Sequence, residues 1–123
     1  MVYIIRIDSK EGVMIFISVE DFFTKASTIP RLSRAEEKAL ALRMIDGDDE
    51  ARKKLIYSYL PSVAFHVRRA PENIRTLNTV YTCIDALEKT VDRFNFLQDS
   101  ETFTHHLSWC LRQCITKCIA SRL

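Results

Sequence analysis

The amino-acid sequence predicts a mainly α-helical protein, a compact helical bundle preceded by an N-terminal β-hairpin. Apolar residues recur at helical spacing through most of the chain, and only two Gly and three Pro leave little room for a turn-rich all-β fold. Two β-prone runs, VYIIRID and VMIFIS, flank a short turn that contains Gly12. We expect residues 1–28 to form the hairpin and a short helix, and residues 29–123 to form the helical domain.

The short helix is expected directly after the hairpin. Ser18 can cap it through its hydroxyl, and Phe22 and Phe23 would anchor it to the rest of the protein. The sequence around Pro30 ends it, because a residue that precedes proline disfavours the helical conformation.

A pair of helices follows, joined by a glycine turn. Ser33 and Glu36 match the capping-box pattern, in which each side chain satisfies a backbone donor at the helix start. This helix stops at Gly47, and Asp48 or Asp49 begins the next. The residues expected inward are Leu40, Ala41 and Met44 in the first helix, and Ala51, Leu55, Ile56 and Tyr59 in the second.

Prolines and capping residues define the next two helices. Pro61 is tolerated only in a first turn, so we expect a separate helix over residues 61–70, closed by Pro71. Asn73 or Thr76 caps a long helix that runs to Phe94. Its expected inward face consists of Leu77, Val80, Ile84, Leu87, Val91 and Phe94.

The last predicted helix begins near residue 103 and is capped by Asp99 or Ser100. The segment from Phe103 to Leu123 contains no acidic residue, Gly or Pro. At about 100° per residue, one side carries apolar residues and cysteines and the other is polar. The inward side is Phe103, Leu107, Cys110, Leu111, Cys114 and Cys118; the polar side is His105, His106, Trp109, Arg112, Gln113 and Thr116.

Trp109 is the unexpected residue on this polar side. One interpretation is that its ring fills a pocket in a neighbouring element. The other is that it forms a platform on which a nucleic-acid base stacks, with Arg112 and Lys117 near the phosphates.

Composition excludes several classes of protein. Hydrophobic residues make up 47% of the 123 residues and charged residues 28%, with a net charge of +2, values typical of a soluble globular domain. No apolar run approaches the ~20 residues that a membrane span needs. The apolar part of the amino-terminal segment is also too short for a signal peptide, so we expect a cytoplasmic protein.

The cysteines of the last helix do not predict a metal site. Along a helix, His106 and Cys118 lie roughly 18 Å apart, so one ion cannot take the whole row His106, Cys110, Cys114 and Cys118. We expect the three cysteines to be buried, reduced and metal-free. His106 and Cys110 lack a third orienting group for catalysis, and no glycine loop suited to phosphate is present, so an enzyme is not expected.

The order and sequences of these helices resemble bacterial sigma factors of the sigma-seventy family. The segment 32–56, LSRAEEKALALRMIDGDDEARKKLI, is similar to the helix pair that opens the conserved core of primary-type sigma factors. YLPSVAFHVRR, residues 59–69, and CIDALEKTVDRFN, residues 83–95, look like the helices that follow. FTHHLSWCLRQCITKCIA, residues 103–120, is similar to the helix that reads and melts the minus-ten promoter element.

The resemblance implies a region-two-like bundle with two binding surfaces. In the family, aromatic residues of the last helix stack on exposed bases, and a Gln and a Thr approach the upstream base pair of the element. The DNA-binding residues implied here are Phe103, His106, Trp109, Arg112, Gln113, Thr116 and Lys117. The family contacts the largest polymerase subunit through the preceding helix, where the residues implied here are Asn78, Tyr81, Thr82 and Glu88.

The chain also departs from the family pattern. Cys110 replaces a second Trp, His106 replaces a Tyr, and Glu101 replaces an aromatic residue. A carboxylate at residue 101 would repel phosphate, and His offers less stacking area than Tyr. Little of the family's polar polymerase-binding pattern remains between Asn78 and Glu88. Residues 1–28 lie outside the resemblance.

Two classes of function are therefore expected. The first is a sigma-like transcription initiation module that binds core RNA polymerase and the single-stranded minus-ten element, without cofactor or metal. The alternative is a degenerate sigma-like module for protein interaction or regulation that no longer supports initiation; a structural relic is a third. The hairpin could also join two copies of the chain into a homodimer.

Overall fold

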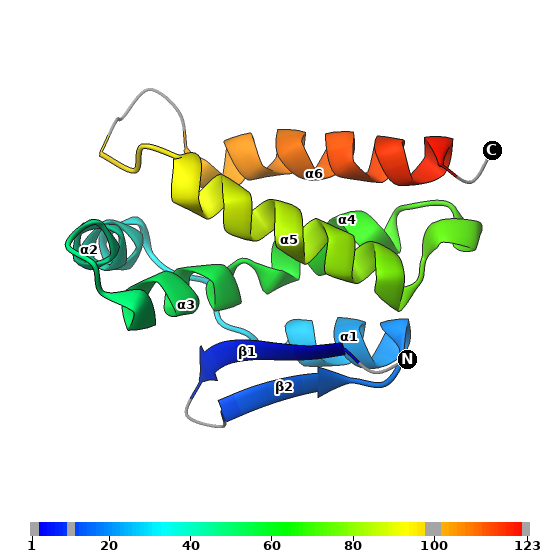
Figure 1. Ribbon diagram of the computed structural model, residues 1–123, viewed down its shortest axis with the longest axis horizontal. Coiled ribbons are helices and arrows are strands. Elements are labelled where there is room, and N and C mark those ends of the chain that lie inside the picture. The colour runs from blue at the N-terminus through cyan, green and yellow to red at the C-terminus, as the bar shows by residue number, and fades with distance from the viewer. Residues whose placement is uncertain (1–2, 10–11, 98–101, 122–123) are drawn as a thin grey trace.

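The computed structural model describes residues 3–9, 12–97 and 102–121 of the 123-residue chain. Helices dominate it, as predicted, and α5 and α6 lie side by side opposite the two strands and α1 (Figure 1). The elements are β1 (Tyr3–Ser9), β2 (Gly12–Phe16), α1 (Val19–Ala26), α2 (Arg34–Ile45), α3 (Asp49–Ser58), α4 (Leu60–Arg68), the 3-10 turn η1 (Glu72–Ile74), α5 (Leu77–Arg93) and α6 (Phe103–Ala120).

The two strands pair antiparallel and pack against the helices. Tyr3 lies opposite Phe16 and Arg6 opposite Val13, and the register becomes irregular between Arg6 and Ser9. β1 runs beside α3, and β2 leads into α1 (Figure 1). The buried Phe16 ring meets Phe22 of α1 edge to face, with centroids 5.0 Å apart. This aromatic contact ties the end of β2 to the core of the bundle.

The first helix starts follow the predicted capping residues. The Ser18 hydroxyl accepts a hydrogen bond from the Asp21 amide at 3.0 Å, at the start of α1. Both bonds of the capping box at Ser33 are present, at 3.0 and 3.1 Å. Gly47 has φ of 95°, a left-handed conformation that favours glycine, and it turns the chain from α2 into α3. Asp48 is the residue that caps α3.

The capping residues of the last two helices were either undecided or wrongly predicted from the sequence. Thr76 caps α5, its hydroxyl accepting from the Thr79 amide at 3.3 Å. Thr102 caps α6, accepting from the His105 amide at 3.2 Å, in place of the predicted Asp99 or Ser100. Those two residues lie outside the described part of the chain. An N-cap must reach an amide two or three positions ahead, which Thr102 does for a helix that starts at Phe103.

The hydrophobic core lies where α4, α5 and α6 meet, and it extends to α1 and α3. Leu55, Val63, Leu87, Leu107 and Leu111 are all fully buried within it. Of the predicted inward residues, Leu40, Met44, Leu77 and Phe94 are only half-buried. They lie near helix ends or on the peripheral helix α2, where fewer elements cover them.

Two polar contacts join helices that are distant in sequence. The Arg52 guanidinium of α3 donates to both carboxylate oxygens of Asp92 on α5, at 2.7 and 3.0 Å. The buried Tyr59 hydroxyl donates to the Glu37 carboxylate of α2. Burial and the neighbouring carboxylate raise the pKa of Tyr59 well above its usual range, so the phenol stays protonated as a donor.

Within residues 3–9, 12–97 and 102–121, no helix combines the length and hydropathy that a bilayer span requires.

Replacing Thr102 tests the cap of α6. Thr102→Ala removes the hydroxyl that satisfies the His105 amide, so we expect a loss of about 0.5–2 kcal/mol in the free energy of unfolding, measured by urea denaturation. Thr102→Ser keeps the hydroxyl and serves as the matched control. Equal losses in both variants would show that the hydroxyl does not cap the helix.

Candidate nucleic-acid interface

The outer side of α6 presents a stripe of exposed residues that begins at Trp109. Trp109 is 55% exposed, and Arg112, Gln113, Thr116 and Lys117 are exposed beside it. On a helical projection Arg112 lies about 60° to one side of Trp109 and Lys117 about 80° to the other. We call these five residues the α6 face. An exposed aromatic plane followed by two cations along the same helix is suited to a stacked base whose neighbouring phosphates run toward those cations.

Polar groups on the α6 face differ in what they can still bind. The Thr116 hydroxyl donates to the Arg112 carbonyl at 2.9 Å, so its oxygen remains mainly an acceptor for an incoming group. The Gln113 side chain carries both a donor and an acceptor, which suits the edge of a base. The α6 face therefore combines stacking, charge and hydrogen bonding within two helical turns.

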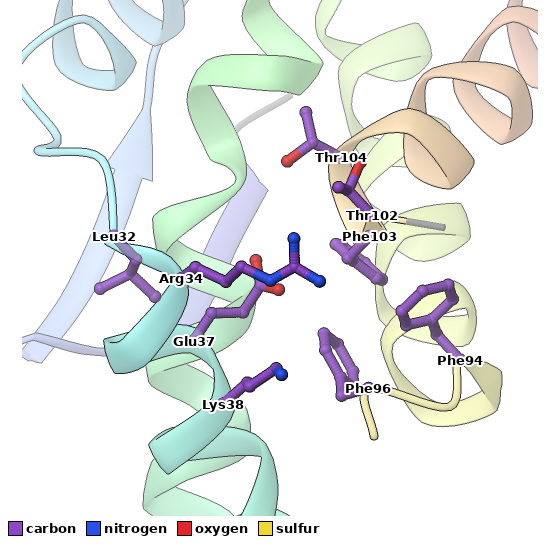
Figure 2. A pocket seen from close by; sticks show the side chains of 9 residues that line it. All are labelled: Leu32, Arg34, Glu37, Lys38, Phe94, Phe96, Thr102, Phe103 and Thr104. Atoms are coloured by element: carbon purple, nitrogen blue, oxygen red, sulfur yellow. The ribbon is translucent and has the colours of Figure 1, made fainter. Parts of the chain in front are cut away.

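Phe103, predicted to bind DNA, is a core residue. Its ring is only 1% exposed and contacts Phe96 in a stacked arrangement at 4.9 Å, Phe94 at 5.2 Å and Tyr59 at 4.6 Å between centroids. Figure 2 shows these phenylalanines on one side of a cavity of about 160 Å³, with Arg34, Glu37 and Lys38 on the other side. A ring enclosed by three others offers no face to a base. The inward position that helical periodicity predicts for Phe103 is therefore confirmed, and the DNA-binding role that the resemblance implies does not fit its burial.

His106 is half-buried, and its ring packs toward the end of α5. Its ring lies 5.4 Å from that of Phe94, and its Nε2 atom is 3.7 Å from the Cys110 sulfur. One side of the imidazole is therefore packed against protein. This geometry leaves His106 at the margin of the α6 face, not among its exposed members.

A groove between α4 and α6 adds residues that the sequence analysis missed. It has a volume of about 540 Å³ and is lined by Phe65, His66, Arg69, Ala70, Pro71, Arg112, Ile115, Thr116 and Ile119. Phe65 is 55% exposed, and the Arg69 guanidinium lies 5.1 Å from its ring centroid. Arg112 and Thr116 belong to both the groove and the α6 face. The sequence did contain a sign of this exposed ring, because Phe65 falls outside the helical spacing of the inward residues Val63, Ala64 and Val67.

The residues predicted to bind polymerase lie along the outer side of α5. Asn78, Tyr81 and Thr82 are exposed there, whereas Glu88 is half-buried. Asp85 and Asp92, which the sequence analysis did not include, share this side at helical spacing. We call the six residues the α5 stripe. Burial raises the pKa of the Glu88 carboxyl. The negative charges of Asp85 and Asp92 raise this pKa further, and the positive charge of Arg52 opposes the increase.

The cysteines are less buried than predicted. Cys114 is buried, but Cys110 and Cys118 are partly exposed at the margins of the inward side of α6. Cys83 of α5 is also buried, and its sulfur lies 3.9 Å from that of Cys114. Among the described residues, no three His, Cys, Asp or Glu side chains gather in a way that could hold a metal ion.

Comparisons with known proteins relate the chain to one class of transcription proteins. No protein-family model matches it. It is 32% identical over 113 residues to the RNA polymerase sigma factor SigA of Clostridium acetobutylicum. The aligned region covers 91% of this chain and 30% of that SigA. A SigA of a Bacillus species is 28% identical over 112 residues, covering 90% of this chain and 29% of the relative.

These matches confirm the resemblance to sigma factors of the sigma-seventy family. The chain spans about 30% of the length of the curated relatives it matches.

Phe103 and Trp109 are expected to differ sharply in their effect on stability. Phe103→Ala empties a buried aromatic site and should lower the free energy of unfolding by about 3–5 kcal/mol. Trp109→Ala changes an exposed side chain and should alter it by about 0.5 kcal/mol or less. Chemical denaturation of both variants measures the difference. A large loss for Trp109→Ala would mean that its ring fills a structural pocket.

Proposed function

We propose that this chain is a sigma-like transcription initiation module that binds core RNA polymerase and the single-stranded minus-ten promoter element. The observation that carries the proposal is the α6 face, where an exposed Trp109 is followed by two exposed cations, Arg112 and Lys117, in a segment similar to SigA. The role is one of binding, and we propose no enzymatic activity.

The α6 face would hold DNA by two separable interactions. Arg112 and Lys117 attract phosphates regardless of sequence, and this attraction weakens with salt because bound counterions are released. Trp109 restores the stacking that a base loses when it leaves the duplex. Gln113 and Thr116 supply hydrogen-bonding groups at the next turn. Binding should therefore depend on single-stranded character more than on sequence.

The α4–α6 groove would extend this surface beyond α6. Its aromatic wall, Phe65, lies beside Arg69, and Arg112 belongs to both the groove and the α6 face. Among the described residues that line the groove there is no carboxylate, so none of these side chains repels a phosphate. A strand that stacks on Trp109 could then continue past Arg112 and contact Phe65.

The α5 stripe would be the surface for polymerase. Tyr81 is 48% exposed among polar and acidic neighbours, and an exposed tyrosine is a frequent energetic centre of protein interfaces. Asp85 is paired with Lys89 at 3.0 Å and Asp92 with Arg52, so part of the acidic charge is already compensated. Weaker polymerase binding than in a complete sigma factor is the expected consequence.

A protein-interaction or regulatory module is the second candidate. Leu42 and Ile45 of α2 are 51% and 58% exposed, and α2 also borders an apolar groove of about 390 Å³. Exposed apolar residues of this kind favour a protein partner. Neither the structure nor the comparisons support a homodimer through the strands.

Single-strand binding tests the DNA half of the proposal. In fluorescence anisotropy with a labelled non-template-strand oligonucleotide, Trp109→Ala should weaken binding roughly 5- to 150-fold, because stacking contributes about 1–3 kcal/mol per base. The loss should be similar at every salt concentration. Lys117→Ala should instead reduce the slope of log K against log salt by roughly 0.7, the value for one phosphate contact.

Matched variants make this measurement specific. Lys54→Ala removes the same charge from α3, away from the α6 face, and should leave the slope unchanged. Phe65→Ala should weaken binding only of oligonucleotides long enough to reach the groove. Equal binding by the wild type and Trp109→Ala, or no binding at low salt, would reject the DNA role and leave the protein-interaction module.

Retention of bacterial core RNA polymerase on the immobilised chain tests the other half. Tyr81→Ala should reduce the amount retained about fivefold or more, because it truncates the exposed aromatic residue of the α5 stripe. Trp109→Ala, which lies on another helix, should retain polymerase as the wild type does. A chain that retains none would favour the regulatory role.

A further inference from the structure

Cys83 and Cys114 form a thiol pair at the interface between α5 and α6. Their sulfurs are 3.9 Å apart, and the Cys83 thiol donates toward the Cys114 sulfur. Cys83 is fully buried and Cys114 is 9% exposed, while α5 and α6 run alongside each other (Figure 1). The two residues are 31 positions apart in sequence, so a bond between them would connect two separate helices.

The surroundings of the pair make the two thiols unequal. Hydrogen bonding from Cys83 lowers the pKa of Cys114, and the Cys118 thiol and the Lys117 ammonium lower it further, against burial and Asp85. The pKa of Cys83 is raised by its hydrogen bond to Cys114 and by burial. One sulfur is thus favoured as the thiolate and its neighbour keeps the proton. This is the division between an attacking cysteine and a resolving cysteine.

We propose that Cys83 and Cys114 are an oxidation site, at which a hydroperoxide closes a disulfide between α5 and α6. The Cys114 thiolate attacks one oxygen of the peroxide, and the O–O bond breaks. The other oxygen leaves with a proton as an alcohol or water, and Cys114 becomes a sulfenic acid. The Cys83 sulfur then attacks the Cys114 sulfur, its proton leaves with the hydroxyl as water, and the S–S bond forms.

Two features of the structure favour this reaction. The sulfurs need to approach by about 2 Å to reach a disulfide length of about 2.05 Å, a shift within the range of side-chain rotation and small helix movement. Cys114 retains some exposure, and the partly exposed Cys118 lies one turn further along α6. An oxidant therefore meets Cys114 before Cys83.

Closure of the bond would join the two candidate binding surfaces. The α5 stripe and the α6 face lie on the helices that the disulfide links. A covalent link restricts their relative movement and also constrains the unfolded chain. The oxidised protein should melt at a higher temperature than the reduced one. This site does not depend on DNA or polymerase binding.

Hydrogen peroxide treatment of the reduced full chain tests the proposal. After the remaining thiols are alkylated, the intact mass should be lower by two hydrogens, and two of the four cysteines should carry no alkyl group. Digestion should then yield one pair of peptides, joined through Cys83 and Cys114. Dithiothreitol should reverse the change. Cys83→Ala and Cys114→Ala should each abolish the cross-link.

The double variant Cys110→Ala with Cys118→Ala keeps the test valid if the buried variants fail to fold. It leaves only the proposed pair, and it should still lose two hydrogens and gain thermal stability on oxidation. Alkylation of both Cys83 and Cys114 after peroxide treatment of the folded protein would overturn the proposal. A cross-link through Cys110 or Cys118, or between two chains, would overturn it as well.

Discussion

Burial of one side of α6 against α4 and α5 is the constraint on which the rest of the structure depends. Phe103, Leu107 and Leu111 are essentially inaccessible to water, and each contributes roughly 1.5–3 kcal/mol relative to an exposed side chain. Because these residues recur every four positions, they fix the rotation of the helix. That rotation leaves Trp109, Gln113 and Thr116 facing outward. The composition of the candidate DNA surface is therefore a consequence of core packing.

The aromatic cluster at the start of α6 shows how the core and the surface compete for the same residue types. Phe94, Phe96, Phe103 and Tyr59 pack together with ring centroids about 5 Å apart, and Tyr59 also bonds to Glu37 of α2. This cluster holds together the ends of four helices. Aromatic residues used in this way cannot stack on bases, and His106 is drawn partly into the same packing by Phe94.

The surface left by this packing is chemically divided. The side shared by α4 and α6 carries Phe65, Arg69, Trp109 and Arg112, an aromatic and cationic combination suited to a polyanion with stacked bases. The outer side of α5 carries Tyr81 with carboxylates such as Asp85, a combination suited to a protein partner. Between these two surfaces lie Cys83 and Cys114, which are in contact but not bonded. The two helices that bear the surfaces thus meet at a pair of free thiols.

The sequence by itself determined the local features of this protein. The caps at Ser18 and Ser33 and the helix stop at Gly47 could be predicted, and the cap of α3 was narrowed to Asp48 or Asp49, because each depends on atoms within a few residues. The outward position of Trp109 followed from helical periodicity, and the likeness to sigma factors followed from the order of the helices.

Only the tertiary structure decided the features that depend on packing between distant segments. Phe65 became a wall of a groove because α6 lies beside α4, and Phe103 was enclosed because Phe94, Phe96 and Tyr59 converge on it. Cys83 met Cys114 because two helices align. Periodicity states which way a side chain points from its own helix, but not what lies there. That information comes from contacts between residues far apart in sequence.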